Sequence, residues 1–340
     1  MKARAAGGGV GHDAATMSDH YQPPTDPYRP RFAGIATLMR MPHVPDPAGL
    51  DVAMAGVPYD LGTWIRPGAR TGPAQVREAS RFLRTHNVAT GVAPFDLCQV
   101  ADLGDAPVDP MDNEGSLAAI TEFFRAISAA GAVPLAIGGD HTIPLLILRG
   151  MRAGGALPAP VALVQVDAHA DVLQIGPGFA GAQVNHGTFA RIAIDEGLVD
   201  GHRSVQVGLR GTQYSADVNA YGREAGVRQI YQHEFEDLGP DGTLAEIRER
   251  AGDGPVYITI DVDGLDPTAC PGTGYPEPGG LTVRELQRIL RGLRGLDVVG
   301  ADVCEVAPAL DPSGATARVA AELAFEELCL LAEAKARRDG

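Results

Sequence analysis

The chain has 340 residues, enough for one large domain or two ordinary ones, and 45% of them are hydrophobic. Its 28 Lys and Arg against 43 Asp and Glu give a formal net charge of −15, which argues against a nucleic-acid groove or binding to an anionic membrane surface. The sequence has no C-x-x-C pair, so neither a disulfide framework nor a zinc knuckle is predicted for Cys98, Cys270, Cys304 and Cys329.

Residues 1–28 are rich in glycine, proline and small residues and show no hydrophobic period, which predicts a disordered tail. This segment has no apolar stretch of the kind that a secretory signal needs, and no run of about 18 apolar residues occurs in the chain. We therefore expect residues 29–340 to form a single domain in the cytoplasm.

Apolar, strand-like runs alternate with helical patterns along this domain. The expected strands cover 51–57, 97–102, 132–138, 161–166, 204–209, 227–231, 256–262 and 297–304, and expected helices include 73–82, 116–129, 143–152 and 281–293. The alternation predicts an α/β protein with a parallel sheet. Periodicity alone does not separate a closed barrel from an open sheet with helices on both faces, because both bury parallel strands.

The fourth strand is followed directly by charged residues, in the stretch VALVQVDAHAD. If the chain stays extended past residue 166, a period of two points Asp167, His169 and Asp171 to the same side. Charges that close require a partner of opposite sign. On this stretch alone, a shared cation and a strand that runs into a solvated turn are equally consistent with the pattern.

Two other strand ends carry similar residues: His141 follows strand 132–138, and Asp261 and Asp263 lie at the end of strand 256–262. Together the three ends offer two imidazoles and four carboxylates, whereas one divalent ion needs only about four to six donors. The set predicts two divalent ions bridged by shared carboxylates. Oxygen ligands mixed with imidazole favour Mn²⁺, with Ni²⁺, Zn²⁺ and Fe²⁺ as alternatives. Helix caps and a buried structural histidine would explain one such end, but hardly three.

Six motifs carry a resemblance to a known family. GGDH, DAHAD, HGT at 186–188, DVDGLDP, PGTG at 271–274 and DVCEVAP at 302–308 resemble, in order and spacing, the ureohydrolases, particularly the agmatinase branch. The likeness runs from about residue 28 to the C-terminus. It implies the arginase fold, a three-layer α/β/α sandwich around an eight-stranded parallel sheet, with a binuclear manganese site.

The same resemblance implies a role for each site residue. One ion would be held by His141, Asp167, Asp171 and Asp261, and the other by Asp167, His169, Asp261 and Asp263. A hydroxide bridging the two ions would attack a guanidinium carbon, and urea and an amine would be released. His186 would transfer a proton to the departing amine, and Glu305 would orient the guanidinium group. The implied partners are a small guanidino substrate and further copies of the chain, in a trimer or hexamer.

The substrate tail is where the motifs differ from the arginases. In arginases an asparagine helps to hold the amino-acid end of the substrate, and Leu173 stands at that position here. The loop 172–185, which ends at Asn185, is nearly uncharged, and Trp64 is bulkier than the residue usual in related sequences. We expect Trp64, Leu173 and Asn185 to line an apolar, rather closed pocket that accepts arginine poorly.

The sequence does not decide between several substrates. Agmatine is the first compound to test, and 4-guanidinobutyrate, a biosynthetic guanidino intermediate and a small guanidine are alternatives. Hydrolysis of a formimidoyl group is a different chemistry on the same site. A partner subunit without activity would be expected to have lost metal ligands, and all six positions are intact.

Overall fold

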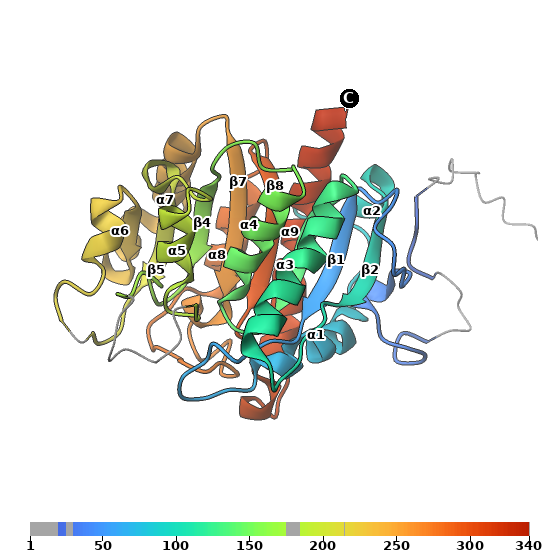
Figure 1. Cartoon of the computed structure of the whole chain (residues 1–340), viewed down its shortest axis with the longest axis horizontal. Helices are drawn as coiled ribbons and strands as arrows, with labels where there is room; N and C mark the ends of the chain where they lie inside the picture. Colours follow the sequence, from blue (N-terminus) through green and yellow to red (C-terminus); the bar gives the residue numbers. More distant parts are fainter. Residues whose placement is uncertain (1–19, 25–29, 175–183, 214, 340) are drawn as a thin grey trace, which may run out of the picture.

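The computed structural model describes residues 20–24, 30–174, 184–213 and 215–339. These residues form one eight-stranded parallel sheet (Figure 1) with the strand order β2-β1-β3-β8-β7-β4-β5-β6. The strands are β1 (Val52–Val57), β2 (Val100–Asp105), β3 (Val133–Gly138), β4 (Ala162–Val166), β5 (Val205–Leu209), β6 (Arg228–Tyr231), β7 (Pro255–Asp261) and β8 (Asp297–Cys304).

The expected strands are present, and the largest shift is in β2. This strand begins at Val100 instead of residue 97, because Pro94–Leu97 form the short helix α2. Proline fits the first turn of a helix, where its missing N–H is not needed. The expected helices are also found, as α1 (Gly72–Ser80), α3 (Asn113–Ala129), α4 (Ile143–Ala153) and α8 (Val283–Gly292).

Four further helices complete the fold: α5 (Phe189–Asp195), α6 (Ala220–Glu224), α7 (Gln232–Ala251) and α9 (Ala315–Asp339). The long helix α9 packs against β8, α1 and α2, and most of its residues are buried. A helix that is buried nearly all round lacks the amphipathic stripe of a surface helix. Periodicity therefore gives a weak signal for this segment.

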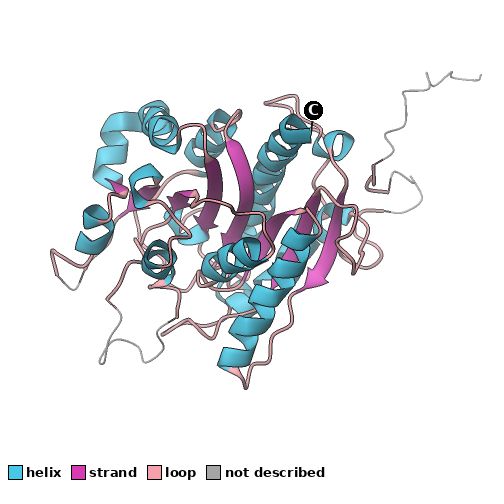
Figure 2. Ribbon diagram, turned by 45° about the horizontal axis from the view of Figure 1, so that its top comes forward, coloured by secondary structure: helices cyan, strands magenta, loops and turns pink. Residues whose placement is uncertain are grey.

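Helices cover both faces of the sheet. The helices α3, α4 and α5 lie over one face, and α1, α2, α7, α8 and α9 pack on the other, each layer enclosing its own hydrophobic cluster. Figure 2 shows the strands between the two layers of helices. The expected α/β/α sandwich is confirmed, and the sheet is open, not closed into a barrel.

The sheet places the charged strand ends together. Because the strands are parallel, their carboxyl ends share one edge, and β3, β8, β7 and β4 are neighbours in the middle of the sheet. None of the described helices is long and apolar enough to cross a membrane. The four cysteines are buried and unpaired.

The expected N-terminal tail falls mostly on residues that the structure does not describe. Of the described residues 20–24, the backbone N–H of Tyr21 donates to Gln99 Oε1 at 2.6 Å and Gln22 Nε2 donates to the carbonyl of Phe95 at 2.8 Å. These two contacts tie the segment to α2 and the start of β2.

Candidate metal and substrate site

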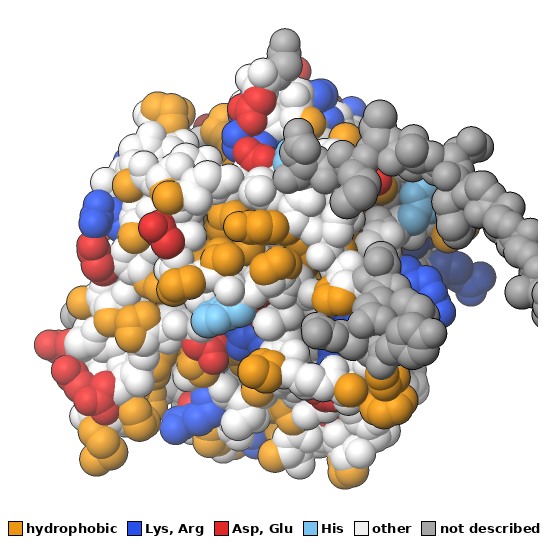
Figure 3. All heavy atoms as spheres, turned by 90° about the vertical axis from the view of Figure 1, so that its right-hand side faces the viewer, with side chains coloured by type: hydrophobic (Ala, Val, Ile, Leu, Met, Phe, Trp, Pro, Cys, Tyr) orange, Lys and Arg blue, Asp and Glu red, His pale blue; other side chains and the backbone are white. Residues whose placement is uncertain are grey.

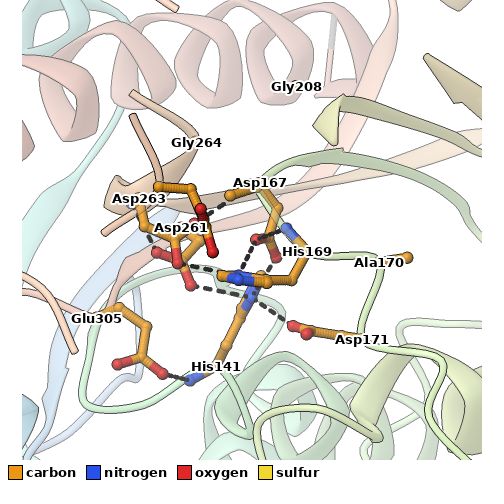
Figure 4. Close-up of polar contacts among 12 residues, drawn as sticks. His141, Asp167, His169, Ala170, Asp171, Gly208, Asp261, Asp263, Gly264 and Glu305 are labelled. Carbon is orange, nitrogen blue, oxygen red and sulfur yellow. Dashed lines mark hydrogen bonds and ion pairs between the residues drawn. The ribbon is translucent and has the colours of Figure 1, made fainter. Parts of the chain in front are cut away.

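His141 lies among three carboxylates at the carboxyl edge of the sheet. Its Nδ1 atom is 2.9 Å from Asp167 Oδ2, 2.9 Å from Asp171 Oδ2 and 3.5 Å from Asp261 Oδ2 (Figure 4). Its other ring nitrogen, Nε2, is 2.9 Å from Thr259 Oγ1. The contact of Nε2 with Thr259 therefore orients the ring, and Nδ1 faces carboxylates that lie at the ends of the neighbouring strands β4 and β7.

A second group lies beside the first. His169 Nδ1 is 3.1 Å from Asp263 Oδ2 and 3.5 Å from Asp167 Oδ1, so Asp167 presents one oxygen to each histidine. The structure thus brings all six expected ligands to one edge of the sheet. Five of them form two groups that could each hold a metal ion and that share Asp167. Asp261 forms a third group with His141 and Cys304, a residue that the sequence analysis left out.

Short local contacts hold these carboxylates in place. Asp167 Oδ1 accepts from the N–H of His169 at 2.7 Å, and Asp261 Oδ1 accepts from the N–H of Asp263 at 2.8 Å. The turn after β7 approaches the end of β4 so closely that a Cβ on Gly264 would lie 2.8 Å from the backbone nitrogen of Asp167. Only glycine fits there without moving the backbone.

Two of the site residues have left-handed backbone conformations. Asp171 has φ 51° and Glu305 has φ 62°. This region is unfavourable for side-chain-bearing residues, less so for Asp than for Glu, and costs on the order of 1 to 2 kcal/mol. The conformation turns Asp171 toward His141, and places Glu305 where its Oε1 accepts from the N–H of His141 at 3.0 Å.

The carboxylates repel one another in the absence of a cation. Burial, together with Asp263 and Asp167, raises the pKa of Asp261 well above its ordinary value, and burial with Asp167 raises the pKa of Asp171 to about 7. Burial alone would also raise the pKa of Asp167, but the two histidines lower it. Such a donor set fits divalent cations, which would compensate the buried charge and hold the acids ionised.

His186 lies next to this cluster and is held from several sides. Its Nδ1 is 3.1 Å from Glu305 Oε1, and its ring meets Trp64 and Tyr275 edge-on, with centroid distances of 5.1 and 5.5 Å. Burial acts to lower the pKa of His186, but Glu305, together with Asp140 and Asp171, raises that pKa above its ordinary value. These contacts hold the imidazole in a defined orientation beside Glu305.

A cavity of about 360 Å³ opens above the cluster. Trp64 and Leu173 line it as expected, and both crowd Gly187, where a Cβ would lie 3.0 Å from Trp64 Cη2 and 2.8 Å from Leu173 Cδ1. Asn185 was also expected in the wall but is not among the cavity-lining residues that the structure describes. It is buried, and its Oδ1 accepts from the N–H of Gly187 at 3.0 Å, so it shapes the turn that carries His186.

Sequence reasoning missed further polar residues of the cavity lining. The lining includes polar and charged side chains that were not expected there, namely Arg210, Thr212, Gln213, Asn219, Tyr275 and Glu277. The guanidinium of Arg210 donates to backbone carbonyls, among them Asp263 O at 2.6 Å and Gly264 O at 3.2 Å. Its position directly after β5 was the signal that could have identified it, since ligands gather at strand ends in such sheets.

Comparison with known proteins agrees with this geometry. The model of the arginase family matches residues 50–329. The chain belongs to the arginase family. It is 50% identical to a guanidinopropionase of Pseudomonas aeruginosa, over 94% of this chain and 99% of that protein. It is 44% identical to a guanidinobutyrase of the same species, over 89% of this chain and 94% of that one.

Solved structures of this family share the fold. Proclavaminate amidinohydrolase from Streptomyces clavuligerus superposes with a TM-score of 0.84 at 40% identity, covering 90% of this chain and all of that one. A hypothetical agmatinase from Burkholderia thailandensis gives a TM-score of 0.82 at 38% identity, covering 91% of this chain and 93% of that chain. The resemblance drawn from the six motifs is confirmed.

Proposed function

We propose that this arginase-family chain hydrolyses a guanidino compound to urea and an amine. The relatives support this class of reaction, hydrolysis of the C–N bond of a linear amidine, because their names describe guanidino hydrolases. The observation that carries the proposal for this chain is the pair of His/Asp groups sharing Asp167, directly beside His186 and Glu305. No expected ligand is missing, which argues against an inactive partner subunit.

Two divalent ions, with Mn²⁺ as the proposed metal, would be held by His141, His169 and the four aspartates. When bound, the ions supply the acidity that turns water into a nucleophile near pH 7. Mixed imidazole and carboxylate donors suit Mn²⁺, and the same donors leave Ni²⁺, Zn²⁺ and Fe²⁺ as alternatives to compare. Cys304, close to His141, is buried and its pKa is raised by burial, so we assign it to packing.

The side chains beside the metal groups would complete the reaction. Glu305 is an acceptor for the guanidinium N–H groups, and His186 carries the proton that the departing amine needs. In the balanced reaction, water oxygen bonds to the guanidinium carbon, one C–N bond breaks, and the products are urea and a protonated amine. General acid catalysis of this kind typically contributes about 10² to 10⁴ in rate.

For the substrate tail, we propose a short guanidino acid of the 3-guanidinopropionate type. The relative at 50% identity supports this choice, because it is named for that compound. The cavity lining includes the apolar side chains of Trp64 and Leu173 and the polar side chains of Asn219 and Arg210, which suits a short chain ending in a polar group. Arg210 contributes a positive charge more than free donors, since its N–H groups already bind backbone carbonyls.

A urea-release assay with Mn²⁺-loaded enzyme tests the reaction and the tail together. The panel would contain 3-guanidinopropionate, 4-guanidinobutyrate, agmatine, arginine and guanidine. A formimidoyl amino acid would be assayed in parallel for formamide, because its hydrolysis releases no urea. We expect the highest kcat/KM for a guanidino acid, with arginine at least about tenfold lower. Agmatine as the best substrate would overturn the tail assignment only, whereas no urea from any compound would overturn the reaction.

We also propose that the chain forms a homo-oligomer, a trimer or hexamer. The exposed large apolar side chains of the described residues all lie in the first third of the chain, namely Tyr21, Phe32, Ile35, Ile65, Phe82, Val88, Leu97 and Met111. Figure 3 shows hydrophobic side chains gathered near the centre of one face. Light scattering would measure the number of chains in the assembly.

A cytoplasmic location stays a prediction.

A further inference from the structure

Three buried glutamines lie side by side on neighbouring strands. Gln165 on β4, Gln206 on β5 and Gln229 on β6 are register partners, and their exposed fractions are 0%, 1% and 5%. Register partners in a parallel sheet point to the same face, so the three amides form a row across the strands. Buried amides cost free energy unless their hydrogen bonds are made.

The row is connected head to tail and ends on a candidate metal ligand. Gln229 Nε2 donates to Gln206 Oε1 at 3.1 Å, and Gln206 Nε2 donates to Gln165 Oε1 at 2.8 Å. Gln165 Nε2 then donates to Asp167 Oδ2 at 2.7 Å. Every amide therefore points its donor toward Asp167, the carboxylate that both metal groups share.

Neighbouring backbone carbonyls fix this direction. Each NH₂ group has a second acceptor besides the next side chain, and rotating an amide would bring its oxygen against a carbonyl oxygen. At the outer end, an arginine donates to the last amide oxygen at 3.4 Å. The backbone acceptors are His169 O for Gln165 at 3.3 Å, Ala170 O for Gln206 at 2.6 Å and Asn219 O for Gln229 at 3.3 Å, and the arginine is Arg223.

We propose that Gln165, Gln206 and Gln229 form a polar ladder that positions Asp167 and thereby sets the affinity of the site for its metal ions. The inference rests on the proposed metal-dependent function. The ladder runs from the cation of Arg223 to the anion of Asp167, so each hydrogen bond polarises the next in the same sense. It also holds the carbonyls of His169 and Ala170, which fixes the turn between the ligands.

The three glutamines are positioning residues, since only Gln165 touches a ligand and none lines the cavity. Groups that orient a metal ligand typically change metal affinity by about 10 to 100-fold when they are removed. The ladder predicts that a substitution of Gln206, which reaches Asp167 only through Gln165, still weakens metal binding. A role in packing alone predicts lower folding stability with unchanged metal affinity.

The test is calorimetric titration of metal-free Gln206→Met with Mn²⁺, alongside the unfolding temperature of the metal-free protein. Methionine has a similar length but cannot donate to Gln165 or Ala170. We expect Mn²⁺ affinity at least about tenfold below wild type. Gln229→Met, at the outer end, should show a smaller loss, and it serves as the second variant if Gln206→Met folds poorly.

Asn87→Leu is the matched control. Asn87 is also a buried amide that donates to a carboxylate, Glu326 Oε2 at 2.8 Å, but it packs against α9. We expect this variant to lose folding stability and to keep wild-type Mn²⁺ affinity. Gln206→Met within twofold of wild-type affinity, or an equal loss in Asn87→Leu, would overturn the ladder while leaving the proposed function intact. Wild-type protein that takes up no Mn²⁺ would overturn both.

Discussion

The amino and carboxyl edges of the sheet differ in how their charged side chains are paired. At the amino edge, Arg203 donates to the carbonyls of Ala251 and Pro255, and Asp297 pairs with Arg338 near solvent. At the carboxyl edge, Asp167, Asp261 and their neighbours are buried and face one another. The amino edge compensates these charges within the chain, whereas the carboxyl edge gathers four aspartates around two histidines, which leaves negative charge for an added cation to compensate. The difference marks which edge is built for a ligand.

The largest expected effect comes from removing a shared carboxylate. Asp167→Ala should lose metal and lower kcat/KM by at least about a thousandfold, because water activation depends on the ions. Asp297→Ala, at the amino edge, removes an exposed ion pair and should change activity by less than about twofold. Elemental analysis and urea release measure both. Equal losses in the two variants would contradict the contrast between the edges.

His186→Ala should separate proton transfer from metal binding. We expect kcat to fall by about 10² to 10⁴, with metal content unchanged, because His186 contacts Glu305 and is not placed in either metal group. The pH profile of kcat should also lose the limb that belongs to the histidine. If turnover persists at the wild-type level across pH, the proton donor lies elsewhere.

Trp64→Ala tests whether the apolar side chains of the cavity determine the length of the substrate. Removing the indole opens space beside Leu173 and His186, so we expect the ratio of kcat/KM for 4-guanidinobutyrate over 3-guanidinopropionate to rise by about tenfold. Metal content should not change. Equal losses for both substrates would mean that Trp64 only supports His186.

Glu327 allows a test of buried charge away from the site. It is fully buried on α9, and neither of its oxygens has a hydrogen-bond partner among the described residues. Burial, with Asp302, raises its pKa well above the ordinary value. An acid whose pKa is raised by folding favours the folded state at low pH, and that contribution is lost as pH rises above the unfolded pKa of about 4.3.

We therefore expect Glu327→Gln to be more stable than wild type at pH 7, by about 1 kcal/mol or more, and this advantage to shrink toward pH 4.5. Thermal unfolding of the metal-free proteins at several pH values measures it. A constant difference across this range would show that folding does not raise the pKa of Glu327.

Much of the carboxyl edge could be predicted because its residues follow strands directly. Asp167, His169 and Asp171 continue a recognisable apolar run, and the parallel sheet brings them to His141 and Asp261. The contacts that could not be predicted join residues that are far apart in the chain. Arg210 and Glu277 meet only after the strand order is known, and the pairing of Gln165 with Gln206 requires the register.

The position of Asn185 could not be predicted for a related reason: a polar residue at the end of a loop can face the cavity or bind its own turn, as Asn185 does at Gly187, and the sequence looks the same in both cases. Helix α9 escaped because a segment buried nearly all round has no amphipathic stripe. Residues of the loop at 175–183, on which the expected tail selectivity partly rests, lie outside the described structure.

The left-handed backbone at Asp171 and Glu305 is kept at some cost in stability. Glycine would adopt this conformation without strain, but it would remove the contacts that the two side chains make. Asp171 contacts His141, and Glu305 accepts from the N–H of His141 and contacts His186. In Glu305→Gly the relief of strain is offset by a buried N–H that has lost this acceptor, so we expect little change in the unfolding temperature of the metal-free protein together with loss of turnover.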